Sequence, residues 1–237
     1  MVISRKKQFL LVFAAFFVLG AAFKVMILVE GLTEVRPANA IPPVAGLAFG
    51  PVGALACALG NLAADAFGTL DWTSVLGVVG NFIAAYLPYR LWHLFSKEEP
   101  NLHRNKNILL YLGVCLVSAF TVAWFLSFGL FIFFGFWIEQ IYTYVFFNNF
   151  GFSAFFGMPM LIIMTSDSIN INCCKPAPHF ILSGSRKKLR NPICALYLLL
   201  MAAVFICVCC LHITPVGAPW LVVLSGLAFA ALLCQLI

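Results

Sequence analysis

Long apolar runs separated by short polar segments make up most of the chain. A run of roughly 20 apolar residues is long enough to cross a bilayer as a helix. Such runs cover Gln8–Val29, Val75–Phe95, Ile108–Phe134, Val145–Met164, Ile193–Ile213 and Trp220–Ile237. With 63% apolar and 9% charged residues and a mean hydropathy of +1.04, the composition lies far from that of a soluble domain. The pattern therefore predicts an all-α fold, a polytopic membrane helix bundle.

A further apolar segment, Arg36–Gly68, is interrupted by the step Gly50-Pro51. Glycine suits the position just past a helix end, and proline suits the first position of the next helix. The segment is therefore predicted to form two short helices near Ala38–Phe49 and Pro51–Phe67. Small residues recur at intervals of four in both of them, a spacing that lets helix backbones approach closely in lipid.

Basic residues concentrate in three segments, 5–7, 90–106 and 175–190. Because basic loops stay on the cytoplasmic side of a membrane, the chain should cross an even number of times between one basic segment and the next. The long runs between the first two segments supply two crossings, so the short helices must supply two more or dip in and return. This count predicts about eight membrane helices, two of them short, with both termini cytoplasmic. It places Arg36 and Asp65 near the outer side.

Asn61 and Asp65 are the large polar residues of the second short helix, and their spacing puts them on one face, one turn apart. An ionisable group at hydrocarbon depth is costly unless it faces protein or water, so it marks a functional site by default. The alternative is that Asp65 lies in the headgroup layer and only solvates a turn. Lys24 either extends to the outer surface, which we expect, or pairs with Glu34 or Asp65. We predict that Asn61 and Asp65 belong to a buried small-molecule site.

Three further polar residues interrupt predicted spans, namely Asn81, Asn148 and Asn149. An amide in lipid needs a partner, and a hydrogen bond to a neighbouring helix would satisfy it as well as a ligand would. Both roles remain open for each of these residues.

Arg36 and Asn39 lie just before Pro42-Pro43. A residue that precedes proline avoids the α region, so Arg36–Ala40 is predicted to be a stiff, extended segment on the outer side, above the short helices. Both side chains are candidates for lining the site.

The nine cysteines show no spacing typical of a zinc site. Cys173-Cys174 lie on the predicted cytoplasmic loop, just before the last basic segment. Cys207, Cys209 and Cys210 lie in an apolar run, where thiols mostly act as small hydrophobic groups. Nucleotide-binding, metalloprotease and serine-hydrolase motifs are absent from the sequence. We therefore expect no metal ion, no cofactor, no enzymatic activity and no nucleic-acid partner.

The string IPPVAGLAFGPVGALACALGNLAADAFG, residues 41–68, resembles the second and third helices of the substrate-binding S components of energy-coupling factor (ECF) vitamin transporters. These helices share the Gly-Pro turn and the Gly/Ala-rich helix that ends in a polar pair. The string NNFGFSAFFGMP, residues 148–159, is similar to their sixth helix. The resemblance covers about Gln8–Thr165 and is strongest over Arg36–Gly68.

The resemblance implies a core of six helices with both ends cytoplasmic and a vitamin-sized ligand at the outer side, under the loop that joins the first two helices. It also implies that a separate T component and a pair of cytoplasmic ATPases supply the energy. The chain departs from the family in two respects. Its first span lacks the alanines four residues apart that the family uses against the T component, and residues 193–237 add a helix hairpin.

We therefore expect a membrane-embedded substrate-binding subunit of an ECF-type importer for a vitamin or related cofactor-like molecule, located in the plasma membrane. The alternative is a membrane sensory module without enzymatic activity. The predicted divisions are a six-helix core over 1–165, a cytoplasmic basic loop with cysteines over 166–191 and a C-terminal transmembrane hairpin over 192–237. The predicted site residues are Arg36, Asn39, Asn61, Asp65, Asn81, Asn148 and Asn149.

Overall fold

The computed structural model describes residues 4–30, 32–68, 70–169 and 184–236, and only the backbone of 184–189. The chain is mostly helical, with a short antiparallel hairpin near its start. In chain order the elements are α1 (Arg5–Ala22), β1 (Ile27–Val29), β2 (Thr33–Glu34), the 3-10 helix η1 (Pro37–Ala40), α2 (Ile41–Phe49), α3 (Pro51–Asp65), α4 (Ser74–Phe95), α5 (Asn105–Phe134), α6 (Glu139–Phe152), the π-helical turn η2 (Ser153–Gly157), α7 (Met158–Met164), α8 (Gly184–Cys209) and α9 (Trp220–Leu236).

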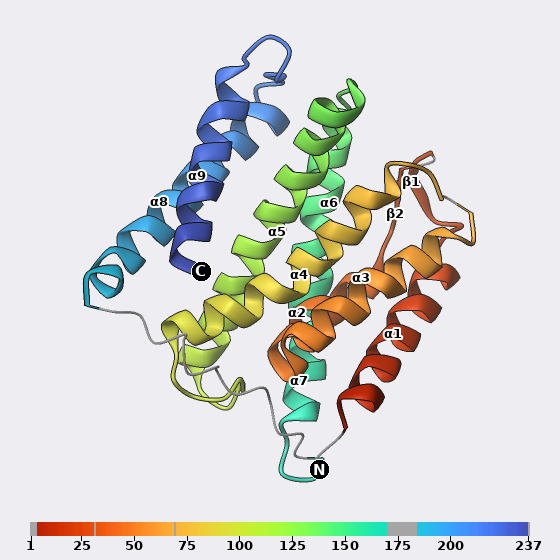
Figure 1. Cartoon of the computed structure of the whole chain (residues 1–237), viewed down its shortest axis with the longest axis vertical. Helices are drawn as coiled ribbons and strands as arrows, with labels where there is room; N and C mark the ends of the chain where they lie inside the picture. The colour runs from red at the N-terminus through yellow and green to blue at the C-terminus, as the bar shows by residue number, and fades with distance from the viewer. Residues whose placement is uncertain (1–3, 31, 69, 170–183, 237) are drawn as a thin grey trace.

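The helices stand side by side, with α1 at one edge of the bundle and the α8–α9 hairpin at the other (Figure 1). Between them α3 and α2 pack on α4, α4 packs on α5, and α5 packs on α6. One apolar core joins α4, α5, α6, α8 and α9, and a second joins α1, α2 and α3. Hydrogen bonds between Thr121 Oγ1 and Tyr197 Oη (2.6 Å) and from Trp124 Nε1 to Ser225 Oγ (2.7 Å) tie the C-terminal hairpin to α5.

Several helices have the length and composition of membrane spans. Within the part of the chain that the structure describes, the stretches Asn105–Phe134, Glu139–Met164 and Arg190–Cys209 are long and apolar enough to cross a membrane, and Trp220–Leu236 is a shorter apolar helix. Apolar side chains on the surface of these helices, such as Leu109 and Leu199, are about 70% and 69% exposed in the isolated chain. Such a surface fits a protein surrounded by lipid, in agreement with the predicted membrane location.

The predicted break at Gly50-Pro51 is confirmed. α2 ends at Phe49 and α3 begins at Pro51, while Gly50 adopts φ 60° and ψ −135°, a conformation open in practice only to glycine. The two short helices then run beside each other and beside α4. A Cβ added at Gly46 would lie 1.8 Å from the backbone oxygen of Ala85, so α2 and α4 pack backbone to backbone at this point. The small residues thus serve the close packing that their spacing predicted.

Two predictions for the segment after the first helix are wrong. The run Gln8–Val29 is not one helix, because α1 ends at Ala22 and residues 27–29 pair as a strand with residues 33–34. β-branched residues in this stretch favour a strand. Residues Arg36–Ala40 are not extended either, since η1 covers Pro37–Ala40. Proline is tolerated in the first turn of a helix, where its missing N–H is not needed, and this outweighs the effect of proline on the residue before it.

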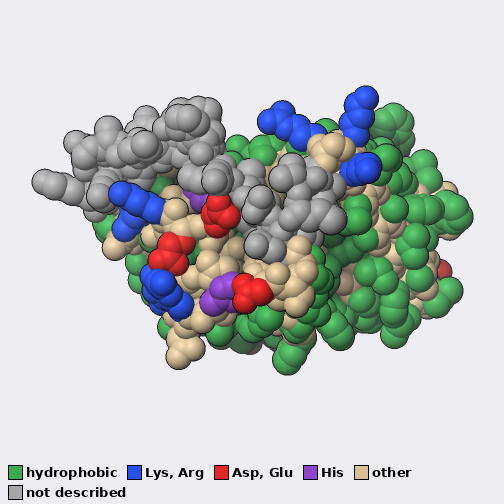
Figure 2. Space-filling model, turned by 90° about the horizontal axis from the view of Figure 1, so that it is seen from below, with side chains coloured by type: hydrophobic (Ala, Val, Ile, Leu, Met, Phe, Trp, Pro, Cys, Tyr) green, Lys and Arg blue, Asp and Glu red, His purple; other side chains and the backbone are tan. Residues whose placement is uncertain are grey.

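Figure 2 views the molecule from below and shows basic, acidic and histidine side chains on this end of the bundle. The start of α1, with Arg5, Lys6 and Lys7, lies at this end (Figure 1). Arg104, at the end of the connection between α4 and α5, and Lys106, at the start of α5, lie there too. The first two basic segments therefore share one end of the molecule, as their charge predicted. Lys175, which begins the third segment, and Cys173-Cys174 just before it lie outside the described residues, and α8 already begins at Gly184, inside the predicted 166–191 loop.

Candidate functional site

Four charged side chains meet at the opposite end of the bundle, where the β1–β2 hairpin lies against the end of α3 (Figure 1). Lys24 Nζ lies 2.8 Å from Asp65 Oδ1 and 3.2 Å from Glu34 Oε1. Arg36 Nη2 lies 2.9 Å from Glu34 Oε1 and 3.5 Å from Asp65 Oδ1. We call these four residues the charge cluster. It joins the segment after α1, the hairpin and α3, which are distant in sequence.

The charge cluster is buried and balanced. The side chains of Glu34 and Asp65 are 4% and 5% exposed, and those of Lys24 and Arg36 are 10% and 18% exposed. Two cations face two carboxylates, so the formal charges cancel. Buried ions keep their charge only when partners replace the lost water, and here each ion has two partners of opposite sign. The expectation that Lys24 extends to the surface is therefore wrong, and the alternative pairing with Glu34 and Asp65 is confirmed.

The pair Asn61 and Asp65 has the predicted geometry. Asn61 Nδ2 donates to Asp65 Oδ2 at 2.9 Å, one turn along α3, and Asn61 Oδ1 accepts from Arg36 Nη1 at 2.9 Å. Asn61 is 1% and Asp65 4% exposed, so Asp65 does not solvate a turn. Asn61 fixes the orientation of both the guanidinium and the carboxylate.

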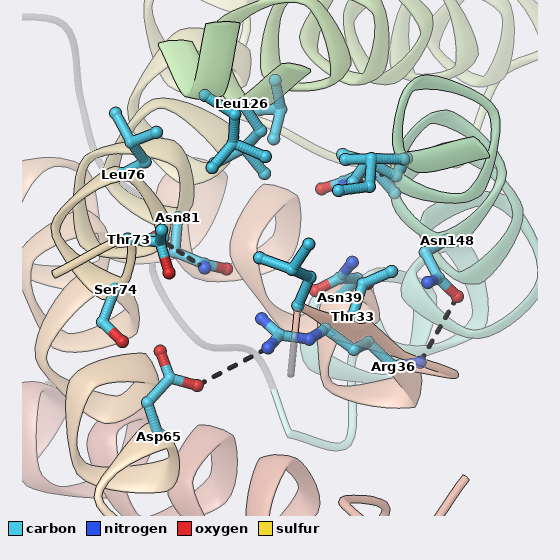
Figure 3. A pocket seen from close by; sticks show the side chains of 17 residues that line it. Thr33, Arg36, Asn39, Asp65, Thr73, Ser74, Leu76, Asn81, Leu126 and Asn148 are labelled. Atoms are coloured by element: carbon cyan, nitrogen blue, oxygen red, sulfur yellow. Dashed lines mark hydrogen bonds and ion pairs between the residues drawn. The ribbon is translucent and has the colours of Figure 1, made fainter. Parts of the chain in front are cut away.

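A cavity of about 80 Å³ opens beside the charge cluster, between the hairpin, η1, α3, α4, α5 and α6 (Figure 3). One side of it is polar and the other apolar. The polar lining consists of Thr33, Arg36, Asn39, Asp65, Thr73, Ser74, Asn81, Asn148 and Asn149. The apolar lining consists of Leu32, Leu76, Val122, Leu126, Leu130, Ile141 and Val145, with Gly77 between them.

Six of the seven predicted site residues line this cavity, and Asn61 does not. Asn61 instead lies behind Arg36 and Asp65, to which it is hydrogen-bonded. The hydroxyls of Thr33, Thr73 and Ser74 and the whole apolar wall were not predicted from the sequence. Hydroxyl side chains at helix starts and in loops are too common to attract notice, and leucines and valines in an apolar run look the same whether they face lipid or a cavity.

The asparagines of the lining take two different roles. Asn148 is engaged by the hairpin, because its Nδ2 donates to the Glu34 carbonyl oxygen at 2.9 Å and its Oδ1 accepts from the Arg36 backbone N–H at 3.3 Å (Figure 3). Asn81 and Asn149 donate from Nδ2 to carbonyl oxygens one turn back on their own helices, Gly77 and Val145, both at 2.9 Å. Asn148 therefore holds the hairpin over the cavity, whereas Asn81 and Asn149 line it.

Asn39 and Arg36 carry hydrogen-bonding atoms that the described residues leave unused. The Asn39 backbone carbonyl accepts from Ser153 Oγ at 3.2 Å, but its buried side-chain amide makes no hydrogen bond within the described ranges and lines the cavity. Arg36 Nε is buried and likewise has no hydrogen-bond partner there. Arg36 runs along the cavity from Asn148 to Asp65 in Figure 3.

The site holds no recognisable apparatus for covalent catalysis or metal binding among the residues described. In that part of the chain no cluster of three or more His, Cys, Asp or Glu side chains could hold a metal ion, and the cysteines described are free thiols away from the cavity. The cavity lining offers amide, hydroxyl and guanidinium groups for hydrogen bonds beside an apolar wall. This combination is typical of small-molecule sites.

Comparison of the chain with protein-family models, with curated proteins and with solved structures finds no match.

Proposed function

We propose that the chain is the substrate-binding subunit of an ECF-type membrane importer, which binds a cofactor-like small molecule in the cavity beside the charge cluster. The observation that carries the proposal is the cavity itself, because buried polar side chains from four separate segments converge on one small space. Burying so many polar groups is costly unless a bound molecule or a packed partner satisfies them. A binding site gives this arrangement a purpose that packing alone does not.

In the proposed orientation the chain crosses the membrane eight times, counting the two short helices, and both termini are cytoplasmic. The basic end of Figure 2 then faces the cytoplasm and the cavity faces outside. The basic segments at one end of the bundle and the cavity at the other support this orientation. The hairpin contributes Leu32 and Thr33 to the lining of the cavity.

The chain itself performs no covalent chemistry in this proposal. A separate T component and a pair of cytoplasmic ATPases supply the energy for release into the cell, and the bilayer surrounds the bundle. Affinity purification from the native membrane distinguishes this assembly from the sensory alternative. Recovery of a membrane protein with two ATPases supports the importer, whereas recovery of a kinase with no ATPase supports the sensor.

Binding is tested by purifying the chain in detergent and identifying retained small molecules by mass spectrometry. The wild type should retain one compound. Asn81→Ala should retain about two- to tenfold less of it, since one lost hydrogen bond costs about 0.5–1.5 kcal/mol. Asn105→Ala, an exposed residue at the basic end of α5, is the matched control and should retain it in full. Equal retention by both variants would remove the cavity as the binding site.

A further inference from the structure

The formal charge of the site limits what it can bind. Lys24 and Arg36 carry two positive charges, Glu34 and Asp65 carry two negative charges, and the ion pairs between them span 2.8–3.5 Å. All other polar side chains in the cavity lining are amides or hydroxyls. A ligand with a net charge would therefore bring an ion that nothing balances into a buried space, which is strongly unfavourable.

The helical hydrogen bonds of two asparagines fix which atoms they offer. Only the NH₂ group of an amide can donate to a backbone carbonyl, so the bonds from Asn81 to Gly77 and from Asn149 to Val145 identify Nδ2 in each case. Oδ1 and the second N–H of each amide are then left for the cavity. Asn39 adds a whole amide that is buried and not hydrogen-bonded within the described part of the chain. The lining thus offers both acceptors and donors, which a ligand with its own N–H and carbonyl groups can match.

Arg36 brings no unbalanced charge to the cavity. Its Nη1 and Nη2 are used by Asn61, Glu34 and Asp65. Its Nε has no hydrogen-bond partner among the residues described, but it is buried within the protein and is not open to a ligand. An anion beside this guanidinium would add to the two carboxylates that lie within 3.5 Å of it.

The size of the cavity and its apolar wall limit the ligand further. A cavity of about 80 Å³ has room for roughly five to eight water molecules, at about 10–15 Å³ for each, which corresponds to one small ring and its substituents. The opposite wall is formed by Leu76, Leu126 and Val145 among other apolar side chains, and these would cover the face of a ring.

We infer that the ligand, or the part of it that enters the cavity, is an uncharged single-ring amide or lactam, with N–H donors for the asparagine oxygens and a carbonyl oxygen for the asparagine N–H groups. This inference rests on the proposed function and narrows it to a class of substrate. It excludes carboxylate and ammonium ligands of the same size.

Three probes of equal ring size test the inference on the full chain in detergent, namely benzamide (uncharged), benzoate (anionic) and benzylamine (cationic at neutral pH). Binding is measured by thermal shift and by titration calorimetry. A fragment of this size in a fitting cavity should bind with a Kd below about 10 mM. Benzamide should bind at least about tenfold more tightly than either charged probe, because each of these brings an unbalanced charge.

Glu34→Gln provides the decisive variant. Glu34 belongs to the charge cluster but is not among the lining residues, so the substitution adds one net positive charge and changes no lining atom. The ratio of benzoate to benzamide affinity should rise by about tenfold or more in this variant. Glu98→Gln removes the same charge in the connection between α4 and α5, at the other end of the bundle, and should leave the ratio unchanged.

The outcomes separate this inference from the proposed function. Tighter binding of benzoate or benzylamine by the wild type, or an unchanged ratio in Glu34→Gln, would overturn the inference while a binding site remains. If no probe binds at about 10 mM, the inference also fails, and the molecule retained from cells decides the proposed function independently. A retained molecule with a net charge on the part that enters the cavity would count against the inference alone.

Discussion

Replacing Lys24 by methionine should destabilise the fold strongly, because it removes one charge from a balanced buried group. Lys24 Nζ contacts Asp65 Oδ1 at 2.8 Å and Glu34 Oε1 at 3.2 Å. The variant leaves two carboxylates facing the single guanidinium of Arg36. Removing one partner of a buried ion pair costs about 3–5 kcal/mol. Since Lys24 and Arg36 keep 10% and 18% exposure and a cavity lies beside them, we expect about 2–4 kcal/mol.

The double variant Lys24→Met with Glu34→Gln should recover much of this loss. It restores neutrality, with Arg36 paired to Asp65 and still bonded to Asn61. Neighbouring residues in one ionic network show interaction energies of about 0.5–3 kcal/mol in a double-mutant cycle. If the charges acted independently, the double variant would be less stable than Lys24→Met by the full cost of Glu34→Gln. That result would refute the reasoning.

Thermal unfolding in detergent provides the assay. Cys57 and Cys115 are buried, so their reaction with a thiol-specific fluorescent dye reports unfolding. At about 2–4 °C per kcal/mol for a chain of this length, Lys24→Met should lower the midpoint by roughly 4–16 °C. Lys106→Met is the matched control. Lys106 Nζ lies 2.9 Å from Glu98 Oε1, but the side chains are 61% and 39% exposed, and such pairs contribute about 0–1 kcal/mol. A shift for Lys24→Met no larger than the control would also refute the account.

Two further predictions test the packing and the topology. Gly46→Ala should destabilise the fold by about 3 kcal/mol or more, because the new Cβ would meet a backbone oxygen of α4 at 1.8 Å. Gly113→Ala is the control and should stabilise the fold slightly, because nothing lies within 4 Å of its added Cβ. Equal unfolding midpoints for the two variants would contradict the close packing of α2 on α4. In intact cells an impermeant thiol reagent should label Asp71→Cys and not Ser96→Cys, above the background of the native cysteines, and labelling of both would contradict the crossing count.

Much of the fold follows from local rules. The turn between α2 and α3 is predicted from Gly50-Pro51, because glycine alone adopts the required φ and ψ and proline suits a helix start. The shared face of Asn61 and Asp65 follows from one helical turn. Both predictions depend only on residues a few positions apart.

What the sequence could not predict depends on contacts between distant segments. Lys24 was expected at the surface because its pairing with Asp65 arises only when the end of α1 meets the end of α3. The helix end at Ala22 was not predicted because the β1–β2 hairpin, which depends on pairing between residues 27–29 and 33–34, replaces the last turns of the predicted span. The apolar wall of the cavity has no sequence signature at all, because Leu126 and Val145 lie in runs that are apolar throughout.

The most direct test of the binding site is calorimetric rebinding of the retained molecule to chain from which it has been removed. Wild type should bind one molecule per chain. Asn149→Ala should bind it about tenfold more weakly, through loss of one acceptor in the cavity, and Asn105→Ala should match the wild type. An absence of saturable binding, or equal affinity in all three proteins, would contradict the claim that the cavity beside the charge cluster holds a solute.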